Sequence, residues 1–279
     1  MKTILIPTDF SPNAWNAMQF AASMFQEEPC KHILLNTYQV PPSSVEAISV
    51  VYVEPMGQAS EVGLKEQLEQ FQALEHHANT VFDTVSGLGD LTRNVRNAVK
   101  ELSADYIVMG TQGASGIGEV LMGSHTASVI KHTECPVICV PENAHFKPFK
   151  KVVLATDFQS IRDEAILDPL QQLARQYDAE VCILNVRSSE NEPVPIEEAT
   201  EGFALHGYFN ETPHKFSTTN ADKVEHGIQD FAHNNQSDLI ALIKRNHSFW
   251  ERLFNRSTTK KMAFHSDIPL LVLPESNKS

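Results

Sequence analysis

The chain has 279 residues, about twice the usual size of one domain, so its length predicts two domains of about 140 residues each. Hydrophobic residues make up 42% of the sequence, enough for packed cores. Acidic residues outnumber basic ones by 35 to 22, and the resulting net charge of −13 argues against general binding to nucleic acid or to an anionic membrane.

The apolar runs of the sequence are short. The opening segment Met1–Pro7 is shorter than the apolar region of a signal peptide, and no later run approaches the ~20 residues of a membrane span. The four cysteines show no CxxC spacing and no histidine at zinc-ligand spacing, so we expect reduced core residues. These features predict a soluble, cytoplasmic protein. The cysteines are Cys30, Cys135, Cys139 and Cys182.

The first half of the chain alternates strand and helix patterns. It opens with an apolar strand that leads into Ser11-Pro12, a pair typical of a helix N-cap followed by proline at the first helical position. Strands joined by helical crossovers form a parallel sheet with helices on both faces. Further strands are expected at His32–Thr37, Val81–Val85, Asp105–Met109 and Pro136–Val140, further helices at Leu64–Ala78 and Leu91–Leu102, and a turn at Gly87–Gly89, while the segment from Pro41 to Gly63 is left unassigned.

The second half of the chain repeats the first. Lys151–Ser160 restates Lys2–Ser11, and Ile268–Pro274 restates Cys135–Pro141. Two intermediate strands repeat in the same order, so we infer a duplicated α/β domain rather than a solenoid. We therefore predict two tandem open parallel-sheet domains of five strands each, residues 1–142 and 149–279, joined by a linker at about residues 143–148.

Five glycines cluster between an expected strand and an expected helix. Glycine has no Cβ and tolerates positive φ, so the backbone N–H groups of such a loop can approach an anion closely. If Ser124 opens the helix, its hydroxyl and the free amides of the first turn face the same place. This arrangement predicts a phosphate-binding loop, and the alternative is a surface loop without a ligand. The glycines are Gly110, Gly113, Gly116, Gly118 and Gly123.

The glycine loop differs from two common nucleotide motifs. It lacks the Gly-Lys-Ser/Thr ending of a P-loop, and Gly116-x-Gly118 is not followed by the third glycine of a dinucleotide fingerprint. In the second half, the three positions that match Gly110, Gly113 and Gly123 carry other residues, and only the serine is kept. We therefore predict one nucleotide site per chain, in the N-terminal half. The second-half residues are Ile243, Asn246, Arg256 and Ser257, and Lys244, Arg245 and Arg252 make that loop cationic, as an anion site or as a solvated surface.

The sequence resembles the universal stress protein family in its tandem two-domain form. The resemblance rests on Pro7-Thr8-Asp9, on the glycine-serine motif Gly110-x2-Gly113-x9-Gly123-Ser124, and on the closing strand Pro136–Val140, which occur in the family's order. It implies the adenine nucleotide α-hydrolase-like, Rossmann-like fold. In the ATP-binding branch of the family these motifs hold the nucleotide, so ATP, alone or with Mg²⁺, is the implied ligand.

The resemblance also implies which residues contact the nucleotide. The phosphates would lie near one group and the adenosine near another. An acid at the carboxyl end of a strand can accept hydrogen bonds from both ribose hydroxyls, but Asp9 has an alternative role as a charge at the helix start, and Met109 and Thr37 have an alternative role in packing. The phosphate group is Gly110, Gln112, Gly113, Gly123, Ser124 and His125, and the adenosine group is Pro7, Thr8, Asp9, Thr37 and Met109.

The function implied by these features is that of a nucleotide-dependent stress-response switch or binding module. The alternatives are a slow ATPase or phosphotransferase and a nucleotide-free interaction scaffold. No catalytic constellation is found, and the histidines are scattered without partners at metal-ligand spacing, so no catalytic or metal site is assigned. Asp157, which matches Asp9, would be a relic or a helix cap. Family members commonly pair through the last strand, which implies an internal pairing of Val137–Val140 with Leu270–Leu273, and a homodimer and an unidentified protein partner are further expectations.

Overall fold

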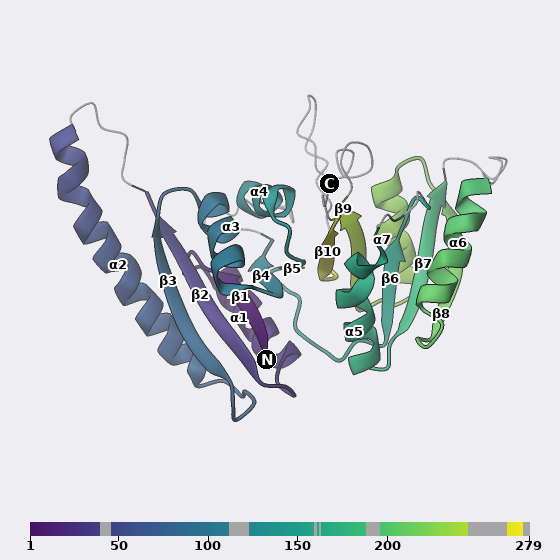
Figure 1. Cartoon of the computed structure of the whole chain (residues 1–279), viewed down its shortest axis with the longest axis horizontal. Helices are drawn as coiled ribbons and strands as arrows, with labels where there is room; N and C mark the ends of the chain where they lie inside the picture. Colours follow the sequence, from purple (N-terminus) through teal and green to yellow (C-terminus); the bar gives the residue numbers. More distant parts are fainter. Residues whose placement is uncertain are drawn as a thin grey trace. The chain divides into compact units, whose positions relative to one another are not determined.

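The structure is a computed structural model that describes residues 1–39, 46–111, 123–158, 161, 163–187, 196–244 and 267–275. The chain divides into two compact units, Met1–Phe146 and Lys147–Ser279, and each is described here by itself (Figure 1). In both units the strands other than β3 and β8 consist mainly of buried aliphatic residues, as expected for a parallel sheet covered on both faces.

The first unit contains a five-stranded parallel sheet, as the sequence predicts. Its strand order is β3-β2-β1-β4-β5. Right-handed crossovers place α1 and α2 on one face and α3 and α4 on the other (Figure 1). The strands are β1 (Lys2–Pro7), β2 (Cys30–Tyr38), β3 (Val81–Leu88), β4 (Tyr106–Gly110) and β5 (Val137–Val140), and the helices are α1 (Pro12–Met24), α2 (Glu46–Gln72), α3 (Leu91–Leu102) and α4 (Ser124–His132).

Helix starts in this unit follow the predicted capping pattern. Ser11 is the N-cap of α1, and its hydroxyl accepts a hydrogen bond of 3.2 Å from the backbone N–H of Ala14. Pro12 occupies the first helical position, where its missing N–H leaves no bond unmade. Asp90 caps α3 by accepting from Arg93 N at 3.0 Å. The predicted helix starts at residues 12 and 91 are therefore confirmed.

Two predicted elements differ from the structure. Helix α2 spans Glu46–Gln72, so it includes much of the unassigned segment, contains Pro55 within it and ends before Ala78. The interior proline and weak apolar periodicity hid this helix in the sequence. Strand β3 pairs with β2 along its whole length up to Leu88, so Gly87 is a strand residue and only Gly89, with φ of 104°, lies in the expected turn.

The second unit repeats the same architecture. Its sheet is parallel, with strand order β10-β9-β6-β7-β8. This confirms the prediction of two five-stranded α/β repeats. The strands are β6 (Lys151–Ala155), β7 (Glu180–Arg187), β8 (His214–Asn220), β9 (Leu239–Lys244) and β10 (Leu270–Pro274), and the helices are the 3-10 helix η1 (Glu164–Leu167), α5 (Asp168–Gln176), α6 (Ile196–Tyr208) and α7 (Val224–Asn234).

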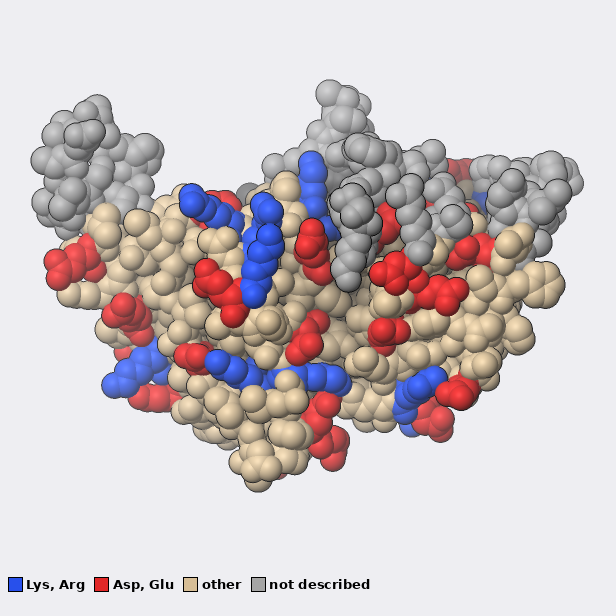
Figure 2. Space-filling model, viewed as in Figure 1, with Lys and Arg blue, Asp and Glu red and all other residues tan. Residues whose placement is uncertain are grey.

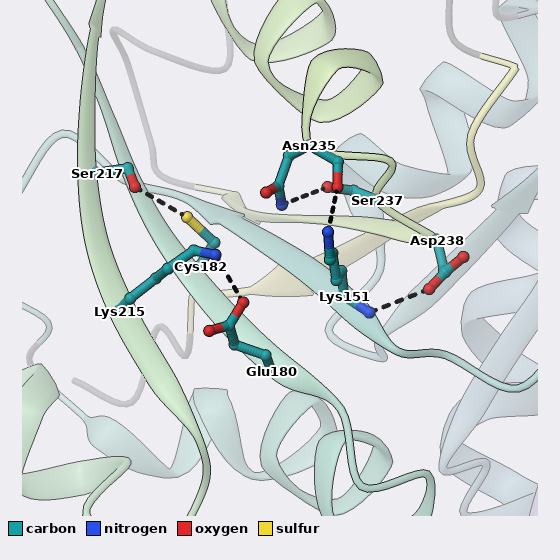
Figure 3. A network of polar contacts seen from close by, with 8 residues as sticks. All are labelled: Lys151, Glu180, Cys182, Lys215, Ser217, Asn235, Ser237 and Asp238. Carbon is teal, nitrogen blue, oxygen red and sulfur yellow. Dashed lines mark hydrogen bonds and ion pairs between the residues drawn. The ribbon is translucent and has the colours of Figure 1, made fainter.

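An aspartate ties two strand starts together in each unit. In the second unit, Asp238 Oδ2 accepts from the backbone N–H of Lys151 at 3.0 Å (Figure 3). The same oxygen accepts from Lys150 N at 2.7 Å, and Oδ1 pairs with Lys147 Nζ at 2.8 Å. Burial alone would raise the pKa of Asp238, but these bonds outweigh it and lower the pKa. In the first unit, Asp105 Oδ2 accepts from Thr3 N at 2.7 Å in the same way. The carboxyl ends of the strands, at the opposite edge, remain for ligands.

Candidate functional site at the carboxyl ends of β1 and β4

The order of strands in the first unit reverses direction between β1 and β4. From β1 the chain proceeds to β2 and β3 on one side, and then returns to β4 and β5 on the other. In open parallel sheets, ligands bind in the crevice outside the carboxyl ends of the strands at this reversal. The residues that follow β1 and β4, beginning with Thr8 and Thr111, lie at this position.

The end of β1 turns sharply into α1. Thr8 Oγ1 accepts from the backbone N–H of Phe10 at 3.0 Å, and Asp9 Oδ1 accepts from the N–H of Ser11 at 3.1 Å. Phe10 has φ of 63°, which is unusual for a residue with a side chain. A Cβ on Gly63 of α2 would come within 2.7 Å of the Phe10 ring, so a glycine is needed there for this ring to lie against the helix. The exposed Asp9 carboxylate is thus held at the mouth of the crevice. Its bond to Ser11, the N-cap residue, also places a negative charge at the start of α1, as in the alternative role.

A chain of side-chain hydrogen bonds lies beneath this turn and joins three strand ends to α2. The hydroxyl of Thr8 donates to Gln67 Oε1 at 2.6 Å, and Asn36 Nδ2 donates to the Thr8 carbonyl at 2.7 Å. Ser60 then donates to Asn36 Oδ1 at 2.7 Å, and Ser86 donates to Ser60 at 2.8 Å. Because most of these groups are buried, each bond satisfies an atom that would otherwise be costly to bury. We call these five residues the Thr8 network.

The second unit builds the same strand end. Thr156 N donates to the Leu184 carbonyl at 2.9 Å, as Thr8 N donates to the Leu35 carbonyl at 2.8 Å. Asn185 Nδ2 donates to the Thr156 carbonyl at 3.1 Å, and Phe158 repeats the positive φ of Phe10, with a value of 51°. The duplication therefore includes the backbone conformation of the turn as well as the strands.

Gly110 lies at the end of β4 for a reason of packing. A Cβ at this position would come within 2.9 Å of Asn13 Cγ in helix α1. The carbonyl of Gly110 accepts a bond of 2.8 Å from the hydroxyl of Thr126, which is buried in the first turn of α4. The close approach of α1 and the anchoring of α4 both meet at this glycine, so packing is a reason for glycine here in addition to the expected ligand contact.

Helix α4 begins at Ser124, as predicted. Its first turn faces the same crevice. Gly123 is its N-cap and has no side chain to bond the free amides. The backbone N–H groups of Ser124, His125 and Thr126 are the first three of the helix, and none has a hydrogen-bond acceptor within the described part of the chain. Such N–H groups, with the positive end of the helix dipole, form an anion-binding position. The side chains of Ser124 and His125 are exposed beside it.

Thr111 adds a polar group at this position. Its N–H donates to the Val140 carbonyl at 3.0 Å, and its carbonyl accepts from the N–H of Gly123. Its hydroxyl is buried and has no hydrogen-bond partner among the described residues. A buried hydroxyl normally finds a partner, so this atom identifies a place where a ligand oxygen or nitrogen would be accommodated.

The remaining expected site residues are distributed as follows. Pro7 is buried at the end of β1, and Met109 is 5% exposed within β4, so both pack in the core beside the expected site. Thr37 is half-buried in β2 opposite Gly87 and points away from α2, since its neighbour Asn36 points toward that helix. Gln112 and Gly113 lie outside the described residues.

In the second unit the position of Gly110 is occupied by a large side chain. Ile243 is 4% exposed in β9, and its place in that strand matches Gly110 in β4. Lys244 ends the strand. Asn246, Arg256, Ser257 and the cationic residues Arg245 and Arg252 lie outside the described residues.

Sequence reasoning did not identify the α2 members of the Thr8 network. Ser60 and Gln67 are seven residues apart, and together with Leu64 and Phe71 they form the buried stripe of the helix. Polar residues at these inward positions were the available signal, because a helix normally keeps this stripe apolar. They became identifiable as site residues only once α2 was placed over the ends of β1 and β2.

The surface gives no sign of a polyanion partner on the face that Figure 2 shows. Lysine and arginine are interspersed there with aspartate and glutamate. None of the helices in the described ranges combines the length and hydropathy needed to cross a bilayer.

The chain is similar to known proteins of one family. The model of the universal stress protein family matches residues 1–141. Universal stress protein Sll1654 of Synechocystis is 31% identical over 140 residues, which are 50% of this chain and 85% of that protein. Universal stress protein MJ0531 of Methanocaldococcus jannaschii is 30% identical over 146 residues, 50% of this chain and 81% of that one.

Solved structures of similar fold span both units. A universal stress protein from Archaeoglobus fulgidus has a TM-score of 0.74 and 17% identity, and the match covers 98% of each chain. At this identity the likeness shows a shared fold. The family model matches half of the chain, and two relatives are 31% and 30% identical to it. These matches show that the chain belongs to the universal stress protein family.

Proposed function

We propose that the first unit binds an adenine nucleotide, namely ATP alone or with Mg²⁺, and that the protein works as a nucleotide-dependent switch or binding module in a stress response. The observation that carries this proposal is the uncapped first turn of α4. Its N–H groups face the crevice where β1 and β4 end, which is where a parallel sheet of this order binds ligands.

The residues present fit such a ligand. The N–H groups of Ser124 and His125 would hold phosphate oxygens, and the exposed carboxylate of Asp9 would accept hydrogen bonds from ribose hydroxyls. The Thr111 hydroxyl is a further donor at the same place. When bound, the nucleotide would supply negative charge at the helix end. Because Thr8 is bonded to Gln67, a ligand at Asp9 would act directly beside the contact that holds α2.

We further propose that only one of the two repeats binds the nucleotide. The N-terminal repeat, residues 1–142, would bind the nucleotide. The C-terminal repeat, residues 149–279, keeps the Thr156 turn but carries Ile243 where the phosphate side of the site has Gly110. In this repeat Asp157 would stabilise the turn that precedes the next helix and would not contact a ligand.

Thermal unfolding with and without millimolar ATP tests the binding proposal. ATP should raise the Tm of the full chain, and Gly123→Val should abolish this rise, because a branched side chain at the N-cap screens the N–H groups. Gly123 has φ of −60° and ψ of 154°, a conformation that valine adopts readily, so this variant should fold. Gly202→Val, at an open position of α6, is the matched control and should keep the response.

Two readouts separate the alternatives. Phosphate release that is lost in Gly123→Val would favour the slow ATPase over the binding module. Protein that is purified without any adenine nucleotide and shows no rise in Tm with ATP would contradict binding and favour the nucleotide-free scaffold.

A further inference from the structure

Two histidines that are eight residues apart in the sequence meet on the surface of the second unit. His206 lies in the last turn of α6, and His214 is the first residue of β8. Nδ1 of His206 and Nε2 of His214 are 2.9 Å apart. The short connection through Tyr208 and Pro213 brings the two rings together, with centroids 5.0 Å apart and planes at 54°.

The protonation pattern of the pair follows from its partners. Nδ1 of His214 is 2.8 Å from the carbonyl oxygen of Thr212, which can only accept, so this nitrogen carries the proton. In neutral His214 the lone pair is then on Nε2, and it accepts a hydrogen bond from Nδ1–H of His206. An imidazole whose far N–H is held by a backbone carbonyl is the arrangement that orients histidine ligands in metal sites.

We propose that His206 and His214 form a bidentate site for a divalent transition metal, with Cu²⁺ preferred over Ni²⁺ and Zn²⁺. Two nitrogens that bind one metal at about 2.05 Å and at a right angle are about 2.9 Å apart, whereas tetrahedral ligands are about 3.3 Å apart. The observed separation of 2.9 Å is that of an N–H···N hydrogen bond, and it brings the two nitrogens close enough to occupy adjacent positions of a square-planar or tetragonal site once the metal replaces the shared proton. That geometry, together with imidazole ligands, selects Cu²⁺ and Ni²⁺ over Zn²⁺.

Binding requires a change of tautomer and a turn of one ring. The proton on Nδ1 of His206 moves to Nε2 of the same ring without net release of a proton. Because the two hydrogen-bonded nitrogens point at each other, the His206 ring must also turn until its Nδ1 lone pair and that of His214 Nε2 converge on the metal. His206 is exposed, so its ring can turn and its Nε2–H can face solvent. His214 is half-buried and held by Thr212, so it provides the fixed ligand.

The surroundings leave the remaining coordination positions to water. Among the described residues, no group of three or more histidine, cysteine, aspartate or glutamate side chains has metal-binding geometry. The carboxylates nearby in sequence are engaged elsewhere, since Glu211 pairs with Arg175 at 2.9 Å and Asp168 accepts from the hydroxyl of Tyr208. The protein therefore provides two side-chain ligands to the metal. This proposal is independent of nucleotide binding.

Titration of the purified full chain with Cu²⁺, followed by electron paramagnetic resonance and calorimetry, tests the proposal. We expect one equivalent of Cu²⁺ to bind with hyperfine coupling from two nitrogens, more tightly than Ni²⁺ and Ni²⁺ more tightly than Zn²⁺. His206→Asn should weaken Cu²⁺ binding at least ten-fold and remove the two-nitrogen signal. His206 is exposed, so this variant should retain the circular dichroism spectrum and Tm of the native protein.

His132→Asn is the matched control. His132 also has its Nδ1 at 2.9 Å from a carbonyl, that of Ser128, but the described structure shows no second imidazole beside it. This variant should bind Cu²⁺ like the native chain. The proposal is overturned if His206→Asn binds Cu²⁺ as tightly as the native chain does, or if both variants lose affinity equally.

Discussion

The hydroxyl of Thr8 donates a hydrogen bond of 2.6 Å to Gln67 Oε1, and this bond joins the end of β1 to helix α2. Both residues are buried, with exposed fractions of 6% and 8%. The same Thr8 oxygen accepts from the N–H of Phe10, so one hydroxyl fixes both the turn after β1 and the position of the helix. The candidate ligand site and α2 thus share a single polar contact.

Replacement of Gln67 by methionine should destabilise the protein. The variant keeps the size of the side chain but leaves the Thr8 hydroxyl without an acceptor, which costs about 1–3 kcal/mol of unfolding free energy. Urea unfolding measures this loss. Gln58→Met, at an exposed position of the same helix, should change stability by less than about 0.5 kcal/mol.

A double-mutant cycle separates the hydrogen bond from other effects of this change. Thr8→Val together with Gln67→Met removes both partners, so the double variant should be more stable than the sum of the single losses implies. Purely additive losses would show that the Thr8–Gln67 bond does not stabilise the fold.

Gly110→Ala should destabilise the first unit through packing. The added methyl would lie 2.9 Å from Asn13 Cγ, which forces α1 or β4 to shift, at a cost of about 1–3 kcal/mol. Asn13→Ala in the same chain should recover part of this loss. Gly202→Ala is the matched control, since nothing lies within 4 Å of its Cβ position, and it should stabilise α6 by about 0.5–1 kcal/mol. A Gly110→Ala variant with native stability would instead assign this glycine to the ligand alone.

The parallel sheets and the duplication could be predicted because they depend on local patterns. Buried strands of valine, isoleucine and leucine and the Ser11-Pro12 pair each identify an element without knowledge of distant contacts. The start of α4 at Ser124 was predictable for the same reason, since a glycine N-cap precedes it.

The remaining features depend on contacts between distant segments. The Thr8 network joins residues up to 59 positions apart, so nothing local in the sequence indicates it. The part of α2 before Leu64 was missed because Pro55 is usually a helix breaker, yet tertiary packing retains the helix. Gly110 has a second reason in the packing of Asn13, which the glycine pattern alone did not reveal.

His32 should make the protein less stable in acid. It lies in β2, is 1% exposed, and packs against the rings of Phe71, His76 and Phe82. Burial, and secondarily His76, lowers its pKa from 6.5 to about 3. Between these pH values the unfolded chain binds a proton at His32 that the folded chain does not. The contribution of His32 to the free energy of unfolding is therefore fully present above pH 6.5 and is lost as the pH falls toward 3.

Substitution by leucine tests this dependence. Urea unfolding of native protein and His32→Leu at a series of pH values should show that the native chain loses up to about 5 kcal/mol more than the variant between pH 6.5 and 3. His226→Leu, which replaces an exposed histidine, should follow the native curve. Parallel curves for native protein and His32→Leu would mean that His32 binds its proton at the same pH in the folded chain as in the unfolded chain, which would contradict this prediction.

The two matched aspartates provide the sharpest test of where a nucleotide binds. Asp9 Oδ1 accepts from the N–H of Ser11, so its role in the turn and its proposed role toward ribose must be separated. Asp9→Asn retains an oxygen for Ser11 but removes the charge. If the carboxylate binds the ribose hydroxyls, this variant should keep the Tm of the native protein without ligand and bind ATP about ten-fold more weakly, since charge-assisted hydrogen bonds are about twice as strong as neutral ones.

Asp157→Asn makes the same change in the second unit, where the turn after β6 has the same form. It should leave ATP affinity unchanged, because Ile243 occupies the position that corresponds to Gly110. Calorimetric titration with ATP compares both variants with the native chain. Equal weakening in the two variants would place a ligand in each unit. A fall in Tm without loss of affinity in Asp9→Asn would leave that carboxylate only its role as a charge at the start of α1. In the proposed arrangement only Asp9→Asn changes the affinity, because only the first unit combines the acid with an unobstructed end of β4.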